Sequence, residues 1–274
     1  MEQYIKALGA LFSAPDVRDY KIAKANLQHS FPETFELTMP AVKNQGAVGS
    51  CVAHSICLVA EYFNKMQYDI DNPLSVGYIY GNRVAPLNTS PGMVTRYAIS
   101  NFCADGTPYH TDFPVHCEVP DIIDEVAKVK DTLHEKARQF RFTAYVKTMQ
   151  PDEIKTALMD GNPVIIAVDW YNDIILQDGV ITFKDKTSLG GHAIVIYGWD
   201  ERGWKIQNSW GSNWGEDGRA ILPYSYPIKE AFAIIDTEKS ALTIDKPCKT
   251  KTKFGNWCIR IANLIYAWWY SIKS

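Results

Sequence analysis

The sequence predicts an α+β fold in which a mainly helical N-terminal subdomain packs on an antiparallel β-sheet or barrel-like C-terminal subdomain. Three observations predict it. Helical periodicity dominates before about residue 140, β-branched and aromatic runs dominate after Pro163, and 274 residues with 46% hydrophobic content can bury a sizeable core. We expect the helical part at about 42–140, the sheet part at about 141–240, and a cleft where they meet.

Four segments have the pattern of helices. In GSCVAHSICLVAEYFNK, apolar residues recur at the spacing of one helical face, and Ser50 precedes the segment as a plausible N-cap. Similar patterns occur in PGMVTRYAISNFCADG and DIIDEVAKVKDTLHEKARQF. The fourth, PDEIKTALMDG, has Pro151 at its start and Gly161 just past its end, the usual punctuation of a helix.

Five short runs in the second half have the composition of strands: PVIIAVDW, GVITF, HAIVIYGWD, GWKIQNSW and RAILPYS. The turn DERG between the third and fourth runs predicts an antiparallel hairpin. It would place His192 at the start of one strand and Asn208 at the end of the next, so that the two side chains meet.

Composition makes several classes of protein unlikely. The net charge is −3, from 28 basic and 31 acidic residues, and no basic stripe marks a nucleic-acid surface. The N-terminus lacks the features of a signal peptide, and no apolar run is long enough for a clear transmembrane helix, so a cytoplasmic location is the expectation. The six cysteines are irregularly spaced and favour free thiols, although Cys103 with Cys117 and Cys248 with Cys258 could pair.

A cysteine at the mouth of a helix points to nucleophilic catalysis. At Cys51, free N–H groups and the helix dipole favour the thiolate over the thiol. His192 could act as its acid/base, and an Asn208 carbonyl accepting from one ring nitrogen would fix the imidazole tautomer. Gln45, across a glycine-bearing turn, could donate to an oxyanion together with the Cys51 backbone N–H.

Three blocks of sequence resemble the signature segments of papain-like cysteine peptidases: VKNQGAVGSCVAH, GGHAIVIYGWD and QNSWGSNWGEDG. In that family the histidine and asparagine lie about 130 to 150 residues beyond the cysteine. Here His192 follows Cys51 by 141 residues and Asn208 by 157. The resemblance implies a papain-like fold and a cysteine-type endopeptidase with Cys51 as nucleophile, His192 as acid/base, Asn208 as its orienter and Gln45 as oxyanion donor. It also implies that Trp210 covers the Asn–His hydrogen bond, with Gly49 and Ser50 in support.

The likeness extends more weakly over residues 15 to 236, where APDVRDY, SVGYIYGNR and GRAILPYSY resemble bacterial members. Val48 stands where many members carry a disulfide cysteine, and Val52 replaces the usual aromatic residue after the nucleophile. The Gly-Cys-x-Gly-Gly substrate-binding segment is missing. SPGMV around Gly92 is a candidate replacement, and Gly191 and His54 are further candidates for substrate contact.

Other interpretations of the same residues stay open. Cys51 could be a buried structural thiol, His54 one turn later could compete as base, and Cys51, His54 and Cys57 could ligate a metal, although their spread around the helix is awkward for a tetrahedral ion. A catalytically silent papain-fold binding protein and an acyltransferase using the same residues are the alternative functions. The favoured mechanism requires no cofactor and no metal.

The two ends of the chain are expected to differ from the peptidase domain at 31–240. Residues 1–30 form a leader, too short for the family's usual pro-domain, that could serve as a short pro-segment or cap. Residues 241–274 combine a basic segment with an amphipathic helix whose apolar face spans 254–272. That helix could pack on its own domain, contact a protein partner or lie on a membrane surface. The oligomeric state is left open.

Overall fold

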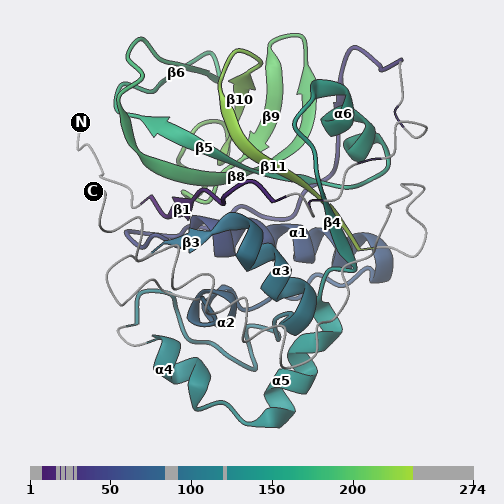
Figure 1. The fold of residues 1–274 in the computed structure, drawn as a ribbon, viewed down its shortest axis with the longest axis vertical. Helices are drawn as coiled ribbons and strands as arrows, with labels where there is room; N and C mark the ends of the chain where they lie inside the picture. The colour runs from purple at the N-terminus through teal and green to yellow at the C-terminus, as the bar shows by residue number, and fades with distance from the viewer. Residues whose placement is uncertain are drawn as a thin grey trace.

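A computed structural model describes residues 8–16, 19, 22, 27, 30–83, 92–119 and 122–236 of the chain. In Figure 1 the described part has a large sheet above and most of its helices below, with α6 beside the sheet. The helices are α1 (Cys51–Tyr68), α2 (Val76–Gly81), α3 (Thr95–Asp105), α4 (Ile122–Ala127), α5 (Asp131–Ala137), the short 3-10 helix η2 (Arg138–Phe140) and α6 (Pro151–Met159).

The sheet has nine strands, eight of them in the order β4-β11-β5-β8-β9-β10-β7-β6 with β2 paired to β8. Their bounds are β2 (Phe35–Glu36), β4 (Ala144–Lys147), β5 (Val164–Tyr171), β6 (Ile175–Gln177), β7 (Val180–Thr182), β8 (Ser188–Asp200), β9 (Gly203–Gln207), β10 (Arg219–Pro223) and β11 (Ile228–Ile235). All neighbours are antiparallel except β10 and β7. Within the described residues β4 and β6 are edges, so the sheet is open, and the expectation of a barrel-like shape is corrected.

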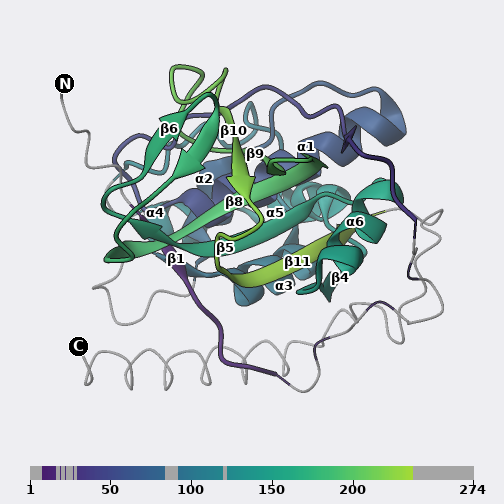
Figure 2. The same cartoon turned by 90° about the horizontal axis from the view of Figure 1, so that it is seen from above.

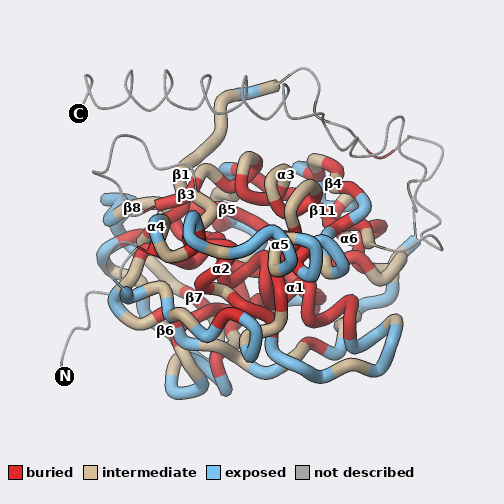
Figure 3. Tube along the Cα trace, turned by 90° about the horizontal axis from the view of Figure 1, so that it is seen from below, coloured by how far each residue is buried: buried red, intermediate tan, exposed pale blue. Residues whose placement is uncertain are grey.

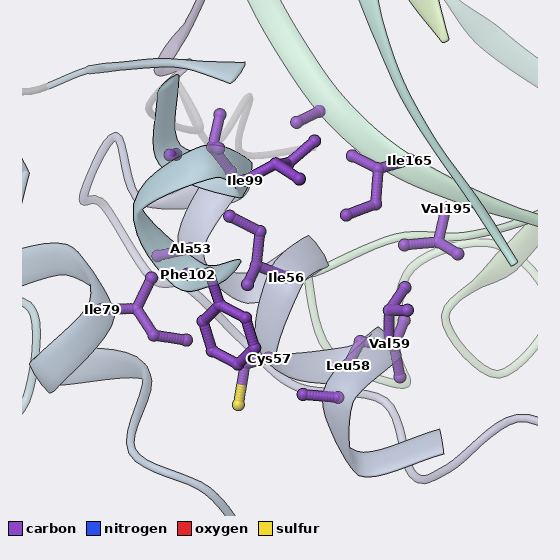
Figure 4. Packing of buried hydrophobic residues seen from close by; sticks show 14 of the residues in the cluster. Ala53, Ile56, Cys57, Leu58, Val59, Ile79, Ile99, Phe102, Ile165 and Val195 are labelled. Atoms are coloured by element: carbon purple, nitrogen blue, oxygen red, sulfur yellow. The ribbon is translucent and has the colours of Figure 1, made fainter. Parts of the chain in front are cut away.

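Both faces of the central strands are buried because helices cover each of them. On one face Ile165 and Val195 pack against α1 and α3 (Figure 4). The alternate residues, such as Ile166 and Ile194, pack with α6 on the other face, which Figure 2 shows from outside. Near-continuous apolar runs such as VIIAV in β5 are the sequence consequence of this double burial.

Helix α1 lies at the centre of the molecule. Its residues from Cys51 to Asn64 are all buried, so it lacks the polar face of a surface helix. In Figure 3 the buried segments gather in the middle, while α5 is largely exposed. The first residue of α1 is therefore held by packing on several sides.

The predicted elements agree with the structure in type more than in their limits. The structure confirms the predicted helices that correspond to α1, α3 and α6, and it confirms the predicted hairpin as β8–β9. The predicted helix over DIIDEVAKVKDTLHEKARQF is instead α4, α5 and η2, and His192 is the fifth residue of β8 rather than its first. Strands β4, β6 and β11 were not predicted, and the C-terminal segment 241–274 lies outside the described residues.

Two further short strands bring the leader to the boundary between the layers. Strand β1 (Ala10–Leu11) pairs in parallel with β3 (Met93–Val94), and β1 lies against β8. Figure 1 shows β1 and β3 between the sheet and the lower helices. This is the level at which α1 begins.

Candidate active site

Cys51 is the first residue of α1 and is completely buried. The preceding turn runs from Gln45 to Ser50, and Gly46 adopts a positive φ of 61°, a conformation that favours glycine. Ser50 occupies the N-cap position as expected, but its side chain makes no capping hydrogen bond and instead lies 3.2 Å from His54 Nδ1. The backbone N–H groups of Cys51 and Val52 hydrogen-bond the thiol, and the helix start has no capping side chain.

The structure brings His192 and Asn208 together. His192 Nε2 lies 2.8 Å from Asn208 Oδ1, and both side chains are buried. The Ser209 backbone N–H, which can only donate, also lies 2.8 Å from Asn208 Oδ1 and so identifies that atom as the amide oxygen. His192 Nε2 therefore carries the proton, and Nδ1 is the basic nitrogen of the neutral ring.

Gln45 is fixed from three directions by its neighbours. Its backbone N–H donates to the Ser209 carbonyl at 2.8 Å, its Oε1 accepts from Ser209 Oγ at 2.6 Å, and its Nε2 donates to the Val48 carbonyl at 2.8 Å. Ser209 thus contacts both Gln45 and Asn208, and it joins the turn before α1 to the loop after β9.

Trp210 lies over the imidazole of His192. Its indole stacks on His192 with centroids 4.5 Å apart and planes inclined by 26°. Because Trp210 is only 6% exposed, it shields the hydrogen bond between His192 and Asn208 from water. A buried hydrogen bond of this kind holds the ring more firmly than an exposed one.

The leader passes directly over this site. An added Cβ on Gly9 would overlap the Gly49 carbonyl, one on Gly191 would overlap the Ala10 carbonyl, and one on Gly92 would lie 2.6 Å from the Gly9 carbonyl oxygen. Met93 N–H also donates to the Gly9 carbonyl at 2.8 Å. We call Gly49, Gly92 and Gly191 the leader-contact surface, because the leader backbone at Gly9 and Ala10 lies against all three.

Polar contacts anchor the leader beyond this surface. Asp19 Oδ2 lies 2.7 Å from Arg96 Nη2 of α3, and both side chains are less than a tenth exposed. The Ser13 backbone N–H and hydroxyl both donate to Glu230 of β11. The leader is therefore attached to both the helical layer and the sheet.

The surroundings of Cys51 oppose ionisation of its thiol. Burial raises the pKa of the Cys51 thiol above its ordinary value, and backbone hydrogen bonds from Ala193 and Gly9 oppose the rise without cancelling it. Ala193 follows His192 on β8, so the sulfur lies beside the strand that carries the candidate base. In this arrangement the excluded water favours a neutral thiol over the thiolate that the helix terminus was expected to favour.

The remaining sequence candidates have mixed outcomes. His54 is buried, its Nδ1 lies 3.0 Å from the Ser50 carbonyl oxygen, and burial lowers its pKa to about 4. It lines a cavity of about 310 Å³ together with Gln45. Cys57 Sγ faces Glu61 and the Leu74 carbonyl, and no group of three His, Cys, Asp or Glu side chains within the described ranges could hold a metal ion, so the metal hypothesis is corrected.

The cysteines of the described segments, Cys51, Cys57, Cys103 and Cys117, form no disulfide with one another. The alternative pairing of Cys103 with Cys117 is therefore wrong, whereas Cys248 and Cys258 lie outside the described residues. Helices long and apolar enough to cross a membrane do not occur in the part of the chain that the structure describes.

Sequence reasoning missed three contributors to the site. Ser209 follows Asn208 inside the quoted block, so its position was visible although its link to Gln45 was not. Trp170 of β5 contacts the imidazole, with centroids 5.1 Å apart, and only the strand register reveals this. The contact of Gly9 with Gly49 joins distant parts of the chain through the backbone and leaves no side-chain pattern.

The fold and these residues define a cysteine-centred site between a helical layer and an antiparallel sheet. Residues 32–223 match the papain family cysteine protease profile, and the chain belongs to that family. It is 25% identical over 221 residues to the viral cathepsin of Adoxophyes honmai nucleopolyhedrovirus, covering 76% of this chain and 59% of that protein. Human cathepsin O is 35% identical over 83 residues, 29% of this chain and 26% of its own length. The chain thus spans less than two thirds of these relatives.

Solved structures agree on the fold. Xylellain, a cysteine protease from Xylella fastidiosa, superposes with a TM-score of 0.73 at 24% identity, covering 85% of this chain and 97% of that one. Digestive procathepsin L 3 from the larval midgut of Tenebrio molitor superposes with a TM-score of 0.62 at 18% identity, covering 80% of this chain and 74% of that one. At these identities the likeness establishes a papain-like α+β fold.

Proposed function

We propose that this chain is a cysteine-type endopeptidase that hydrolyses peptide bonds through a thioester acyl-enzyme. The observation that carries the proposal is the hydrogen bond from His192 Nε2 to Asn208 Oδ1, buried under Trp210. It leaves Nδ1 as the basic nitrogen, on a residue whose neighbour Ala193 hydrogen-bonds the Cys51 sulfur. A binding protein has no physical need for this arrangement.

Each step uses groups of the chain and one water molecule. His192 Nδ1 takes the thiol proton, and Cys51 Sγ adds to the substrate carbonyl carbon. The resulting oxyanion accepts from Gln45 Nε2–H and the Cys51 backbone N–H. His192 then protonates the amine as the C–N bond breaks, leaving a thioester. Water, deprotonated by His192, attacks the thioester and releases a carboxylic acid and the thiol.

We further propose that the leader holds this enzyme latent. Substrate must reach Cys51 across the surface that Gly9 and Ala10 cover, and the raised pKa of the Cys51 thiol disfavours attack while they remain. The leader must therefore leave this surface before turnover. This role is supported by its anchors at Arg96 and Glu230, which lie on two different layers.

The test is proteolysis by full-length protein carrying Gly9→Val. The new side chain would overlap the Gly49 carbonyl and displace the leader, because overpacking against backbone costs on the order of 1–3 kcal/mol. Pro15→Ala, at an exposed leader residue, is the matched control. We expect Gly9→Val to cleave unfolded casein about ten-fold faster than wild type and the control, and Gly9→Val/Cys51→Ala not to cleave it.

Products separate the alternative functions. Cleavage in ¹⁸O-labelled water should place the label in the new carboxylates, as hydrolysis requires. Joining of the acyl fragment to added glycinamide, with little labelled acid, would instead establish an acyltransferase. A folded Gly9→Val protein that does neither would contradict the peptidase proposal and favour a silent papain-fold binding protein.

A further inference from the structure

Two indoles from separate segments contact the imidazole of His192, and a third packs behind them. Trp210 stacks on it, while Trp170 meets it edge-on, with centroids 5.1 Å apart and planes inclined by 78°. Trp170 also packs on Trp210 at 4.8 Å and on Trp214 at 6.3 Å. Trp214 contacts the two other indoles, and its nearest ring partners do not include the imidazole.

Strand register places Trp170 beside His192. Val168 pairs with His192 and Trp170 pairs with Gly190 across β5 and β8. Residues two apart along a strand share a face, so Trp170 and His192 are diagonal neighbours on one face of the sheet. Glycine at 190 removes the side chain that would stand directly opposite the indole. The indole is 6% exposed and belongs to the packed cluster that contains Trp210.

Trp170 opposes a tilt of the His192 ring that the contacts with Asn208 and Trp210 do not prevent. The hydrogen bond to Asn208 holds Nε2, and Trp210 covers one ring face, but Trp210 lies in the loop after β9. Trp170 lies in a central strand and contacts both rings. Without it, the imidazole and Trp210 could tilt together, moving Nδ1 while Nε2 stays bound to Asn208.

We propose that Trp170 is a positioning residue that holds His192 at the angle from which Nδ1 protonates the leaving amine. The role rests on the proposed peptidase function. Protonation of the amine requires Nδ1 within hydrogen-bond reach of the nitrogen, and small displacements of a catalytic group are costly. A leaving group that departs as a stable anion does not need this proton. Loss of Trp170 should therefore slow amide cleavage more than cleavage of an activated ester.

The experiment measures kcat/KM, which reports on acylation, for one acyl peptide as its 4-nitroanilide and its 4-nitrophenyl ester. Full-length Gly9→Val protein is the parent, since its leader is displaced, and active sites are titrated so that misfolded protein does not count. Trp170→Ala, Trp170→Phe and Trp214→Ala are compared in this background. Trp214→Ala is the matched control because it removes an indole from the same cluster.

We expect Trp170→Ala to lower kcat/KM for the anilide about ten-fold and to lower that for the ester less than about three-fold, since general acid catalysis contributes only to the former. Trp170→Phe should restore most of the ratio, and Trp214→Ala should leave it unchanged. An equal fall in kcat/KM for the anilide and the ester would overturn the role of Trp170 while leaving the peptidase proposal intact. An equal change in the anilide-to-ester ratio for Trp214→Ala would do the same. A folded parent that hydrolyses neither substrate would overturn the proposed function, and this role with it.

Discussion

Ser209→Ala should weaken the oxyanion site without touching the base. The substitution removes the hydroxyl that donates to Gln45 Oε1 at 2.6 Å. It keeps the backbone N–H that donates to Asn208 Oδ1, so the orientation of His192 is preserved. The Gln45 amide then loses one of the two contacts that distinguish its oxygen end from its nitrogen end, and keeps the donation from Nε2 to the Val48 carbonyl. A flipped amide would present a carbonyl to the oxyanion.

The expected loss follows from the energy of that one contact. A buried hydrogen bond between neutral groups contributes about 1 kcal/mol net. Since 1.4 kcal/mol is about ten-fold in an equilibrium constant, the ratio of productive to flipped amide should fall about five-fold, and kcat/KM should fall by at most about that factor. Removing an oxyanion donor altogether costs about 10²–10³. Gln45→Ala should therefore be far more damaging than Ser209→Ala.

A double-mutant cycle in the full-length Gly9→Val background isolates the effect, with peptide anilide hydrolysis as the assay. Ser209→Ala should cost little further activity once Gln45 is alanine, because its hydroxyl then has no amide to orient. Ser212→Ala, at an exposed serine of the same loop, is the control. Equal losses from Ser209→Ala in both backgrounds would refute the reasoning, since they would indicate a general structural effect.

Two further predictions concern stability and latency. Burial lowers the pKa of His54 to about 4, so between about pH 6.5 and 4 the unfolded chain binds a proton at His54 that the folded chain does not. As the pH decreases through this range, the free energy of unfolding should fall by about 3 kcal/mol because of His54. Urea unfolding of His54→Gln should show a shallower pH dependence, and an unchanged slope would contradict this. Asp19→Asn removes the buried charge that pairs with Arg96, so the leader should detach more readily and casein cleavage should rise above that of Pro15→Ala protein. Activity equal to the control would show that this anchor does not hold the leader.

Local sequence patterns predicted those helices and strands in which apolar side chains recur at a regular helical or strand spacing. The apolar spacing after Cys51 identified α1, and the DERG turn identified the hairpin that joins His192 to Asn208. Strand β11 escaped prediction because Lys229 and Glu230 interrupt its apolar run. In the structure Glu230 Oε1 accepts hydrogen bonds from the distant Ser13. The long helical pattern after residue 121 breaks because residues of both α4 and α5 pack on one small cluster around Tyr78.

The candidate site was predictable where chemistry dictates residue type. A nucleophile, a base, an orienting amide and an oxyanion donor have few possible identities, so the three sequence blocks were enough to propose candidates for these roles. The indole of Trp170 reaches His192 only through the register of β5 and β8, and the leader meets Gly49 only through backbone. Neither relation has a local sequence signal, because each depends on segments that folding brings together.

The most direct test of the account is covalent labelling of Cys51. The experiment treats three full-length proteins with an epoxysuccinyl peptide and measures their intact masses by mass spectrometry: wild type, Gly9→Val and Gly9→Val/Cys51→Ala. Burial raises the pKa of Cys57 well above its ordinary value and that of Cys117 to about 11, so these thiols should not react. We expect an adduct that forms faster in Gly9→Val than in wild type and that is lost after Cys51→Ala. No adduct on folded Gly9→Val protein, or the same adducts formed at the same rate after Cys51→Ala, would contradict an activated nucleophile at Cys51.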